Sequence, residues 1–227
     1  MVAIVALRRS AIVVDCGPQP SDSRKTSKMT RLLRLAAPSL ALAILPSAAF
    51  AHTGVGDTSG FAHGFMHPLG GLDHVLAMVA VGLLAARLGG RALWLVPLSF
   101  VTMMILGGIA GMSAMDLPFV EQGIAGSILV LGFVIALGRQ VPTAAAMALA
   151  GFFAIFHGHA HGTEMSVDAA GLFYGVGFAL ATTLLHGLGL GVGIGADRLA
   201  GTWGSQTSRI AGGMMAAAGA GLMAGVM

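Results

Sequence analysis

The chain has 227 residues, of which 56% are hydrophobic and only 9% charged, and its mean hydropathy is +0.87. This composition excludes an ordinary soluble domain and predicts an all-α membrane protein with several spans. Seven of the twelve Lys and Arg residues precede position 35, so the net charge of +3 predicts no nucleic-acid partner. Lys25 and Lys28 are the only lysines, which excludes a later phosphate-binding G-x-x-x-x-G-K-[ST] loop.

The N-terminal region has the pattern of a secretory signal. From Met29 the sequence has a basic start, a short apolar run and a final A-F-A. We therefore expect a cleavable signal peptide over residues 29–51 and a mature chain over residues 52–227. Residues 1–28 fit no domain, and we interpret them as a non-native upstream extension. The alternative is an uncleaved anchor helix, although two prolines interrupt the short apolar run.

Six apolar segments of roughly spanning length follow in the mature chain. They are expected at about residues 68–88, 92–112, 120–138, 142–160, 169–194 and 208–227. Every Arg after the signal lies at the first, third or fifth connection, whereas the second and fourth connections carry only acids. Because basic residues favour the cytoplasmic side, these patterns predict a six-helix bundle with both ends of the mature protein outside.

Glycine rows predict where the helices pack closely. Gly107-x-x-x-Gly111 and the row Gly187, Gly191, Gly195 have the small-x-x-x-small spacing that lets helix backbones approach one another in lipid. We therefore expect both rows at helix–helix contacts.

A first cluster of metal-ligand residues starts at His63, in the stretch H-G-F-M-H-P-L-G-G-L-D-H-V-L-A-M. Pro68 suits the first position of a helix, so a helix is expected to begin there with His67 as its cap. At 3.6 residues per turn, His67, the glycine pair after Pro68 and His74 share one side of that helix. Asp73 is close enough to be a further ligand or to hold an imidazole N–H. The alternative is a set of core histidines with structural partners.

A second cluster ends the fourth segment, where the sequence reads F-H-G-H-A-H-G-T-E. In a helix, His157 and His161 share a face. The first segment enters from outside and the fourth leaves to the outside, so both clusters are expected at one surface, together with His52. This cluster also contains His159 and Glu164. The alternative is that the whole stretch is a solvated histidine-rich loop.

His186 lies apart from both clusters, in the fifth segment. It is about 17 residues, or roughly 25 Å, from the outer end of that helix. A buried ionisable group inside a span is a functional candidate, although Thr182, Thr183 or a backbone carbonyl could satisfy it.

The donor atoms narrow the class of metal. The only cysteine, Cys16, precedes the mature chain, so any metal is held by nitrogen, oxygen or thioether sulfur. Imidazole and carboxylate suit Ni²⁺, Co²⁺, Zn²⁺ or Cu²⁺, and methionine would also tolerate Cu⁺.

These motifs carry a family resemblance. H-P-L-G-G-L-D-H-V-L-A-M at 67–78 and F-H-G-H-A-H-G-T-E at 156–164, with six spans after a signal, resemble the HupE/UreJ family of nickel permeases. The resemblance covers the mature chain, and the leader before Met29 departs from the family pattern. Its implied transport motifs are His67, Asp73 and His74 in the first span and His157, His161 and Glu164 in the fourth, with His159 at a variable position.

The resemblance implies a permease of the bacterial inner membrane that supplies nickel for hydrogenase or urease maturation, with cobalt or another divalent metal in some members. Ni²⁺ would be the transported ion, not a permanent cofactor, and a metallochaperone of hydrogenase or urease a candidate partner. The residues themselves leave a metal receptor without transport as an alternative. Two further alternatives are a haem protein and an intramembrane hydrolase. The hydrolase would use either a Ser127–His186 dyad or a bound metal ion. We expect no enzyme.

Overall fold

The computed structural model describes residues 60–165, 168–200 and 203–226. All of them belong to one compact unit of the chain, Ala48–Met227. The expected signal peptide, the upstream extension and His52 lie outside the described residues.

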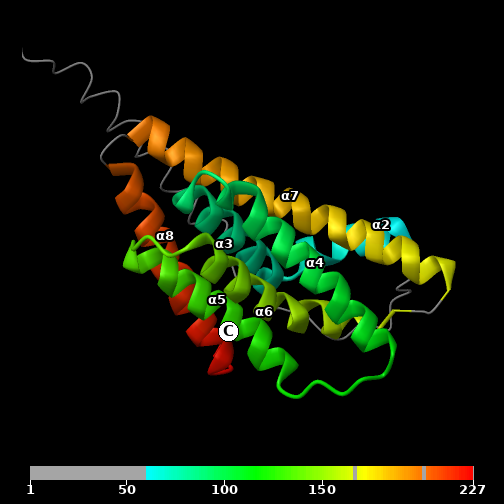
Figure 1. The fold of residues 1–227 in the computed structure, drawn as a ribbon. Coiled ribbons are helices and arrows are strands. Elements are labelled where there is room, and N and C mark those ends of the chain that lie inside the picture. Colours follow the sequence, from blue (N-terminus) through cyan, green and yellow to red (C-terminus); the bar gives the residue numbers. More distant parts are fainter. Residues whose placement is uncertain (1–59, 166–167, 201–202, 227) are drawn as a thin grey trace, which may run out of the picture. The chain divides into compact units, whose positions relative to one another are not determined.

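The described chain is helical, and no strand occurs in it, so the all-α prediction is confirmed (Figure 1). The helices are α2 (Phe61–Gly70), α3 (Leu72–Leu88), α4 (Ala92–Met112), α5 (Val120–Leu137), α6 (Thr143–Gly162), α7 (Ala169–Ala200) and α8 (Gly204–Met223). Two of them end where the sequence offers glycine: Gly89 follows α3 with φ 68° and Gly138 follows α5 with φ 71°. Only glycine adopts such left-handed conformations without strain.

Four helices are long and apolar enough to cross a membrane, namely α4, α5, α6 and α7. The pair α2 and α3 makes a fifth candidate if its two helices are counted as one bent span. This supports a membrane protein with four to five candidate spans among the described residues. The sixth predicted span, at 208–227, overlaps α8, but α8 does not reach the apolarity of a span, because it begins with Ser205, Gln206 and Arg209 and continues largely in glycine and alanine.

The predicted start of the first helix at Pro68 is wrong, whereas its predicted end agrees with that of α3 at Leu88. Helix α2 runs through Pro68 and ends at Gly70, Gly71 is extended with φ −101° and ψ 123°, and α3 begins at Leu72. The two helix axes meet at 85°. Two consecutive glycines have low helix propensity, so the chain breaks there and not at the proline. His67 therefore lies within the last turn of α2 and is not a helix cap.

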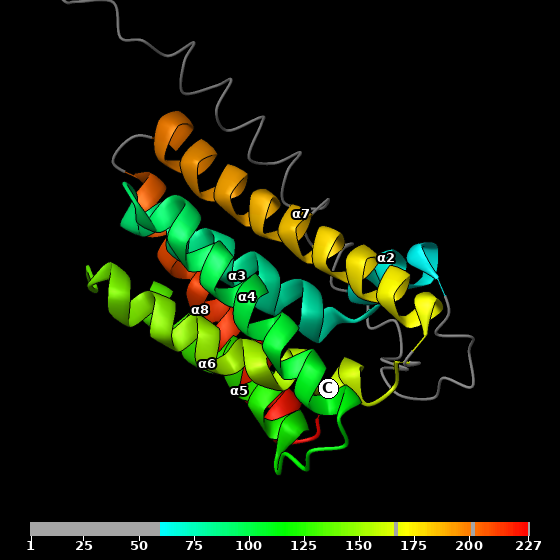
Figure 2. The same ribbon diagram turned by 45° about the vertical axis from the view of Figure 1, so that its right-hand side comes forward.

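Helix α3 lies at the centre of the described bundle, because it contacts every other described helix. Helix α7 runs along α3 and α2, α6 packs along α4, and α8 packs along α5 (Figure 2). Most of the buried apolar side chains of α3, such as Met78, Val81 and Leu84, belong to the core. Residues at the start of α3 are thus held among several helices at once.

One predicted glycine row forms a helix contact and the other does not. A Cβ at Gly107 would collide with the backbone of Ile155 in α6, which confirms that the Gly107–Gly111 row packs α4 on α6. A Cβ added at Gly187, Gly191 or Gly195 would meet no atom of another described helix within 4 Å, so the predicted contact is wrong.

Helix α7 packs on α3 through the glycines that alternate with those of the predicted row. A Cβ at Gly189 would collide with the carbonyl of Val79, and one at Gly193 would lie 2.5 Å from the Cβ of Ala86. Two positions along a helix turn by about 200°, so the alternating glycines form two rows on opposite sides of α7. The spacing is the same in both rows and does not tell which side faces α3.

Candidate metal site

His74 of α3 and His161 of α6 meet at the centre of the site. Their Nε2 atoms lie 2.7 Å apart, and both residues are only 3% exposed. On its other side, His74 has Nδ1 2.9 Å from Oδ1 of Asp73. A carboxylate only accepts hydrogen bonds, so Nδ1 of His74 donates and its Nε2 carries a lone pair. His161 therefore donates its Nε2–H to His74.

Gly71 makes room for the pair formed by Asp73 and His74. A Cβ at Gly71 would lie 2.6 Å from Oδ1 of Asp73 and 3.1 Å from Nδ1 of His74. The sequence-based expectation that the glycine pair leaves space beside the imidazoles is confirmed at Gly71, whereas a Cβ at Gly70 would meet no atom of the described residues within 4 Å. The bend that breaks the helix is thus also the place where the carboxylate and the imidazole fit.

The bend brings His67 back over the centre. The ring centroid of His67 lies 4.5 Å from that of His161 and 6.1 Å from that of His74. Phe178 of α7 packs against the same group, with its centroid 4.6 Å from His161 and 6.1 Å from His67. Three helices thus supply imidazoles and a fourth covers them with an aromatic ring.

His157 is the fourth imidazole of the cluster. It is fully buried, one turn before His161 on α6, and its centroid lies 5.2 Å from that of His74. Its Nε2 lies 3.1 Å from the hydroxyl of Ser127 in α5, and that hydroxyl donates its own proton to the carbonyl of Ile124 at 2.6 Å. Ser127 can therefore only accept from His157, which leaves the lone pair on Nδ1 of His157.

Nδ1 of His157 is buried and has no hydrogen-bond partner. A buried polar atom without a partner costs about 1–3 kcal/mol, and a metal ion would satisfy it. Sequence reasoning missed this role of Ser127. The proposed Ser127–His186 dyad does not form, because Ser127 bonds to Ile124 and His157.

The remaining predicted ligands lie in different places. His159 points away from the cluster, and its Nε2–H donates to the carbonyl of Met115 at 2.6 Å. His63 is exposed on α2, with its ring centroid 6.1 Å from that of Tyr174. Glu164 is exposed in the turn that follows α6. His186 is buried in α7, where it packs against Phe100.

In the described part of the chain, no three His, Cys, Asp or Glu side chains already stand in metal-binding geometry. The direct bond between His74 and His161 explains this, because two nitrogens that share a proton cannot both offer lone pairs. Metal–nitrogen bonds of ~2.0–2.1 Å place two ligand nitrogens of a tetrahedral ion ~3.4 Å apart. To hold an ion between them, His161 would carry its proton on Nδ1, and the two Nε2 atoms, now 2.7 Å apart, would separate by less than an ångström.

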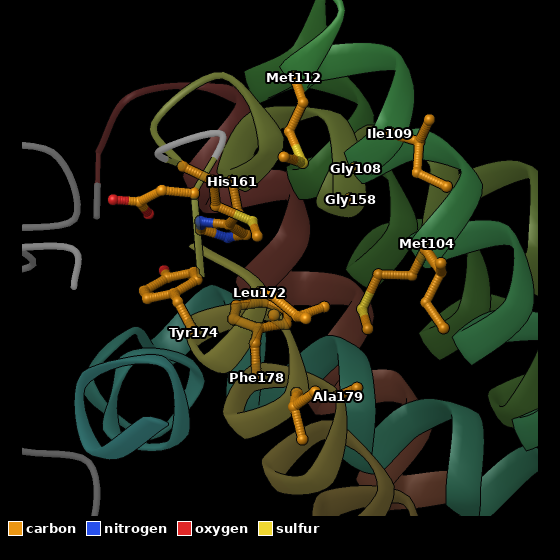
Figure 3. Close-up of a pocket in the computed structure, with 15 residues that line it drawn as sticks. Met104, Gly108, Ile109, Met112, Gly158, His161, Leu172, Tyr174, Phe178 and Ala179 are labelled. Carbon is orange, nitrogen blue, oxygen red and sulfur yellow. The ribbon is translucent and has the colours of Figure 1, made fainter. Parts of the chain in front are cut away.

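A pocket of about 620 Å³ lies between α4, α6 and α7, and His161 forms part of its wall (Figure 3). The other lining residues are mostly apolar and include the thioethers of Met104, Met112 and Met165. Tyr174 and Phe178 line it on the side of α7. The imidazole cluster is thus adjacent to a space large enough for an ion with part of its hydration shell.

Comparison with known proteins agrees with the motifs. The family model described as "HupE / UreJ protein" matches residues 40–222. Protein HupE of Rhizobium leguminosarum bv. viciae is 44% identical over 186 residues, which make up 82% of this chain and 95% of that protein. No solved structure matches the chain. With a family match over most of its length and this relative, the chain belongs to the HupE/UreJ family.

Proposed function

We propose that the protein is a secondary permease that takes a divalent transition metal, Ni²⁺ above all, from the periplasm to the cytoplasm. The observation that carries the proposal is the meeting of four imidazoles from three helices, His67, His74, His157 and His161, inside an apolar bundle. Buried ionisable groups in membrane proteins mark the paths of ions and substrates.

The donor set suits the proposed cargo. Neutral imidazoles are good ligands for borderline ions such as Ni²⁺ and Co²⁺. Asp73 holds the Nδ1–H of His74 and so directs Nε2 towards the ion, as carboxylates do at many metal-bound histidines. The family association with hydrogenase and urease favours Ni²⁺ among these ions and a metallochaperone of either enzyme as the partner that receives it.

The proposed orientation places the histidines outside and the arginines inside, in the inner membrane of a bacterium. The structure supports two distinct ends: Arg87 at the end of α3 donates to the carbonyl of Gly138 at the end of α5, at 2.6 Å. Arg209 near the start of α8 donates to the carbonyl of Ala136 at 3.0 Å. Two arginines, from the end of α3 and the start of α8, thus gather at the end of α5, as a positive cytoplasmic side requires. The proposed orientation requires α8, the least apolar of these helices, to cross the membrane as the sixth span and to return the C-terminus to the periplasm.

The membrane potential can drive the proposed uptake without ATP. Moving one charge inward gains about 2.3 kcal/mol per 100 mV, and a dication about twice that. No enzyme activity is proposed, because the hydroxyl of Ser127 donates to Ile124 and is not paired with a general base that could remove its proton.

Reconstitution tests the proposal. Purified protein in proteoliposomes with an inside-negative potential should accumulate ⁶³Ni²⁺, whereas empty liposomes and His74→Ala proteoliposomes should not. A protein that binds Ni²⁺ in detergent but accumulates none in proteoliposomes would be a metal receptor or delivery protein, and the permease assignment would be wrong.

A further inference from the structure

His186 is a buried imidazole that the fold does not satisfy. It is only 1% exposed, and neither of its ring nitrogens has a hydrogen-bond partner. The threonines that could have satisfied it are engaged elsewhere. The Thr183 hydroxyl donates to the carbonyl of Ala179 at 2.7 Å, and the Thr182 hydroxyl points to the sulfur of Met104 at 3.8 Å. A neutral imidazole always carries one N–H and one lone pair, so both are left without a partner.

Phe100 connects His186 with the outer cluster. Its ring centroid lies 5.6 Å from that of His157 and 5.1 Å from that of His186, and Phe100 is fully buried. The rings of His161, His74, His157, Phe100 and His186 therefore form an unbroken series of contacts that leads from α6 and α3 to α7. Phe100 is the only member of this series that offers no ligand atom.

Two further donors lie beside His186. Thr182 is one turn earlier on α7, so its side chain is on the same side of the helix, and it is fully buried. Through its contact with Met104, a hydroxyl oxygen and a thioether sulfur come together one helical turn before His186. This set has a single imidazole and no carboxylate, so it is a weaker ligand set for a divalent ion than the four imidazoles of the outer cluster.

We propose that His186, with the Thr182–Met104 pair one helical turn before it, is a second and weaker binding site for a divalent transition metal, separated from the outer cluster by the ring of Phe100. Conduction requires binding strong enough to replace the hydration of the ion and weak enough to release it. The outer cluster meets the first requirement and the site at His186 the second. The direction of passage rests on the proposed permease function, but binding at His186 does not.

Equilibrium dialysis of Ni²⁺ against the full-length protein in detergent tests the site directly. The wild type should bind one Ni²⁺ tightly and a second more weakly. His186→Leu should lose the weaker equivalent and keep the tight one, whereas His74→Ala should lose the tight one. An exposed histidine of α2 gives the matched control, and His63→Leu should bind like the wild type. An identical isotherm for His186→Leu and the wild type, or loss of both equivalents in His186→Leu, would overturn the proposal.

The leucine variant should fold, because it replaces a buried ring without hydrogen-bond partners by an apolar side chain. Its thermal unfolding midpoint should equal or exceed that of the wild type. A lower midpoint would show that the imidazole is a structural element and would also count against the site. His186→Gln, which keeps a polar side chain, serves as the second variant in the same dialysis.

Uptake separates failure of this site from failure of the permease assignment. In proteoliposomes, His186→Leu should slow ⁶³Ni²⁺ accumulation by about tenfold while its tight binding is unchanged, as expected for loss of a release step. If the wild type itself accumulates no Ni²⁺, the permease function is wrong, and the dialysis isotherms still decide whether His186 binds metal. If the wild type accumulates Ni²⁺ and His186→Leu does so at the same rate, the site at His186 does not lie on the transport path, and the permease assignment stands.

Discussion

The hydroxyl of Ser127 lies 3.1 Å from Nε2 of His157, and the direction of this hydrogen bond determines which nitrogen of the imidazole is available. Because Ser127 donates to Ile124, it accepts from His157, and the lone pair of His157 is on its buried Nδ1, which has no hydrogen-bond partner in the described chain. Ser127 thus acts on the site without touching the ion. It is a positioning residue for His157.

Ser127→Ala should weaken Ni²⁺ binding by about ten- to a hundredfold, the range found when the partner of a metal-bound imidazole is removed. His157 can then adopt the other tautomer or turn its ring. Dialysis of Ni²⁺ against the purified variant measures the change. The control is Ser99→Ala, which removes another hydroxyl that donates to a backbone carbonyl, that of Met147. Equal binding by Ser127→Ala and the wild type would show that the tautomer of His157 does not matter.

The two glycines at the bend should respond differently to the same methyl group. Gly71→Ala places a Cβ 2.6 Å from Oδ1 of Asp73, and φ of −101° suits alanine, so the expected damage is to the carboxylate–imidazole pair and not to the backbone. Moving that pair should cost about 1–3 kcal/mol and reduce Ni²⁺ uptake. Gly70→Ala meets no atom within 4 Å and should leave uptake unchanged. Similar uptake by both variants would contradict this role of Gly71.

Only the part of the site that depends on local helix geometry could be predicted from the sequence. The shared face of His157 and His161 depends only on helix periodicity, and the structure confirms that both contact His74. The bend did not follow from the sequence, because Pro68 is compatible with the first turn of a helix and also, as found here, with a later turn. The partner of Ser127 could not be predicted either, since it lies 30 residues away on another helix.

The side of α7 that packs on α3 was predicted wrongly. Two substitutions, one in each glycine row, test which row faces α3. Gly189→Val would drive a side chain into the backbone of Val79, whereas Gly187→Val faces no atom within 4 Å in the described chain. Gly189→Val should therefore reduce the free energy of unfolding by about 1–3 kcal/mol or more. Both the amount of folded protein in the membrane and the unfolding temperature should fall. Gly187→Val should change neither. Size-exclusion chromatography and thermal unfolding in detergent provide both measurements.

The histidines of α6 should divide into two classes. His161→Ala removes a ring that contacts both His67 and His74, so uptake should be lost while the protein remains folded. His159→Ala removes only the donor to the carbonyl of Met115, which should lower stability by about 1 kcal/mol and leave uptake per folded molecule unchanged. Wild-type uptake by both His67→Ala and His74→Ala would refute the cluster as the transport site. Loss of uptake in a stable His159→Ala protein would show that the transport path also includes the connection after α4.

The proposed orientation in the membrane predicts opposite accessibility for the two ends of α5. Glu121 lies in the first turn of α5, and Arg139 follows its last residues, near the end where Arg87 and Arg209 gather. With Cys16 replaced by Ser, single cysteines at these two positions can be labelled in intact cells by a reagent that does not cross the inner membrane. Glu121→Cys should react, and Arg139→Cys should react only after the membrane is opened. Labelling of both from outside, or of Arg139→Cys alone, would reverse or abolish the assignment of the histidine cluster to the periplasmic side, and with it the inward direction of transport.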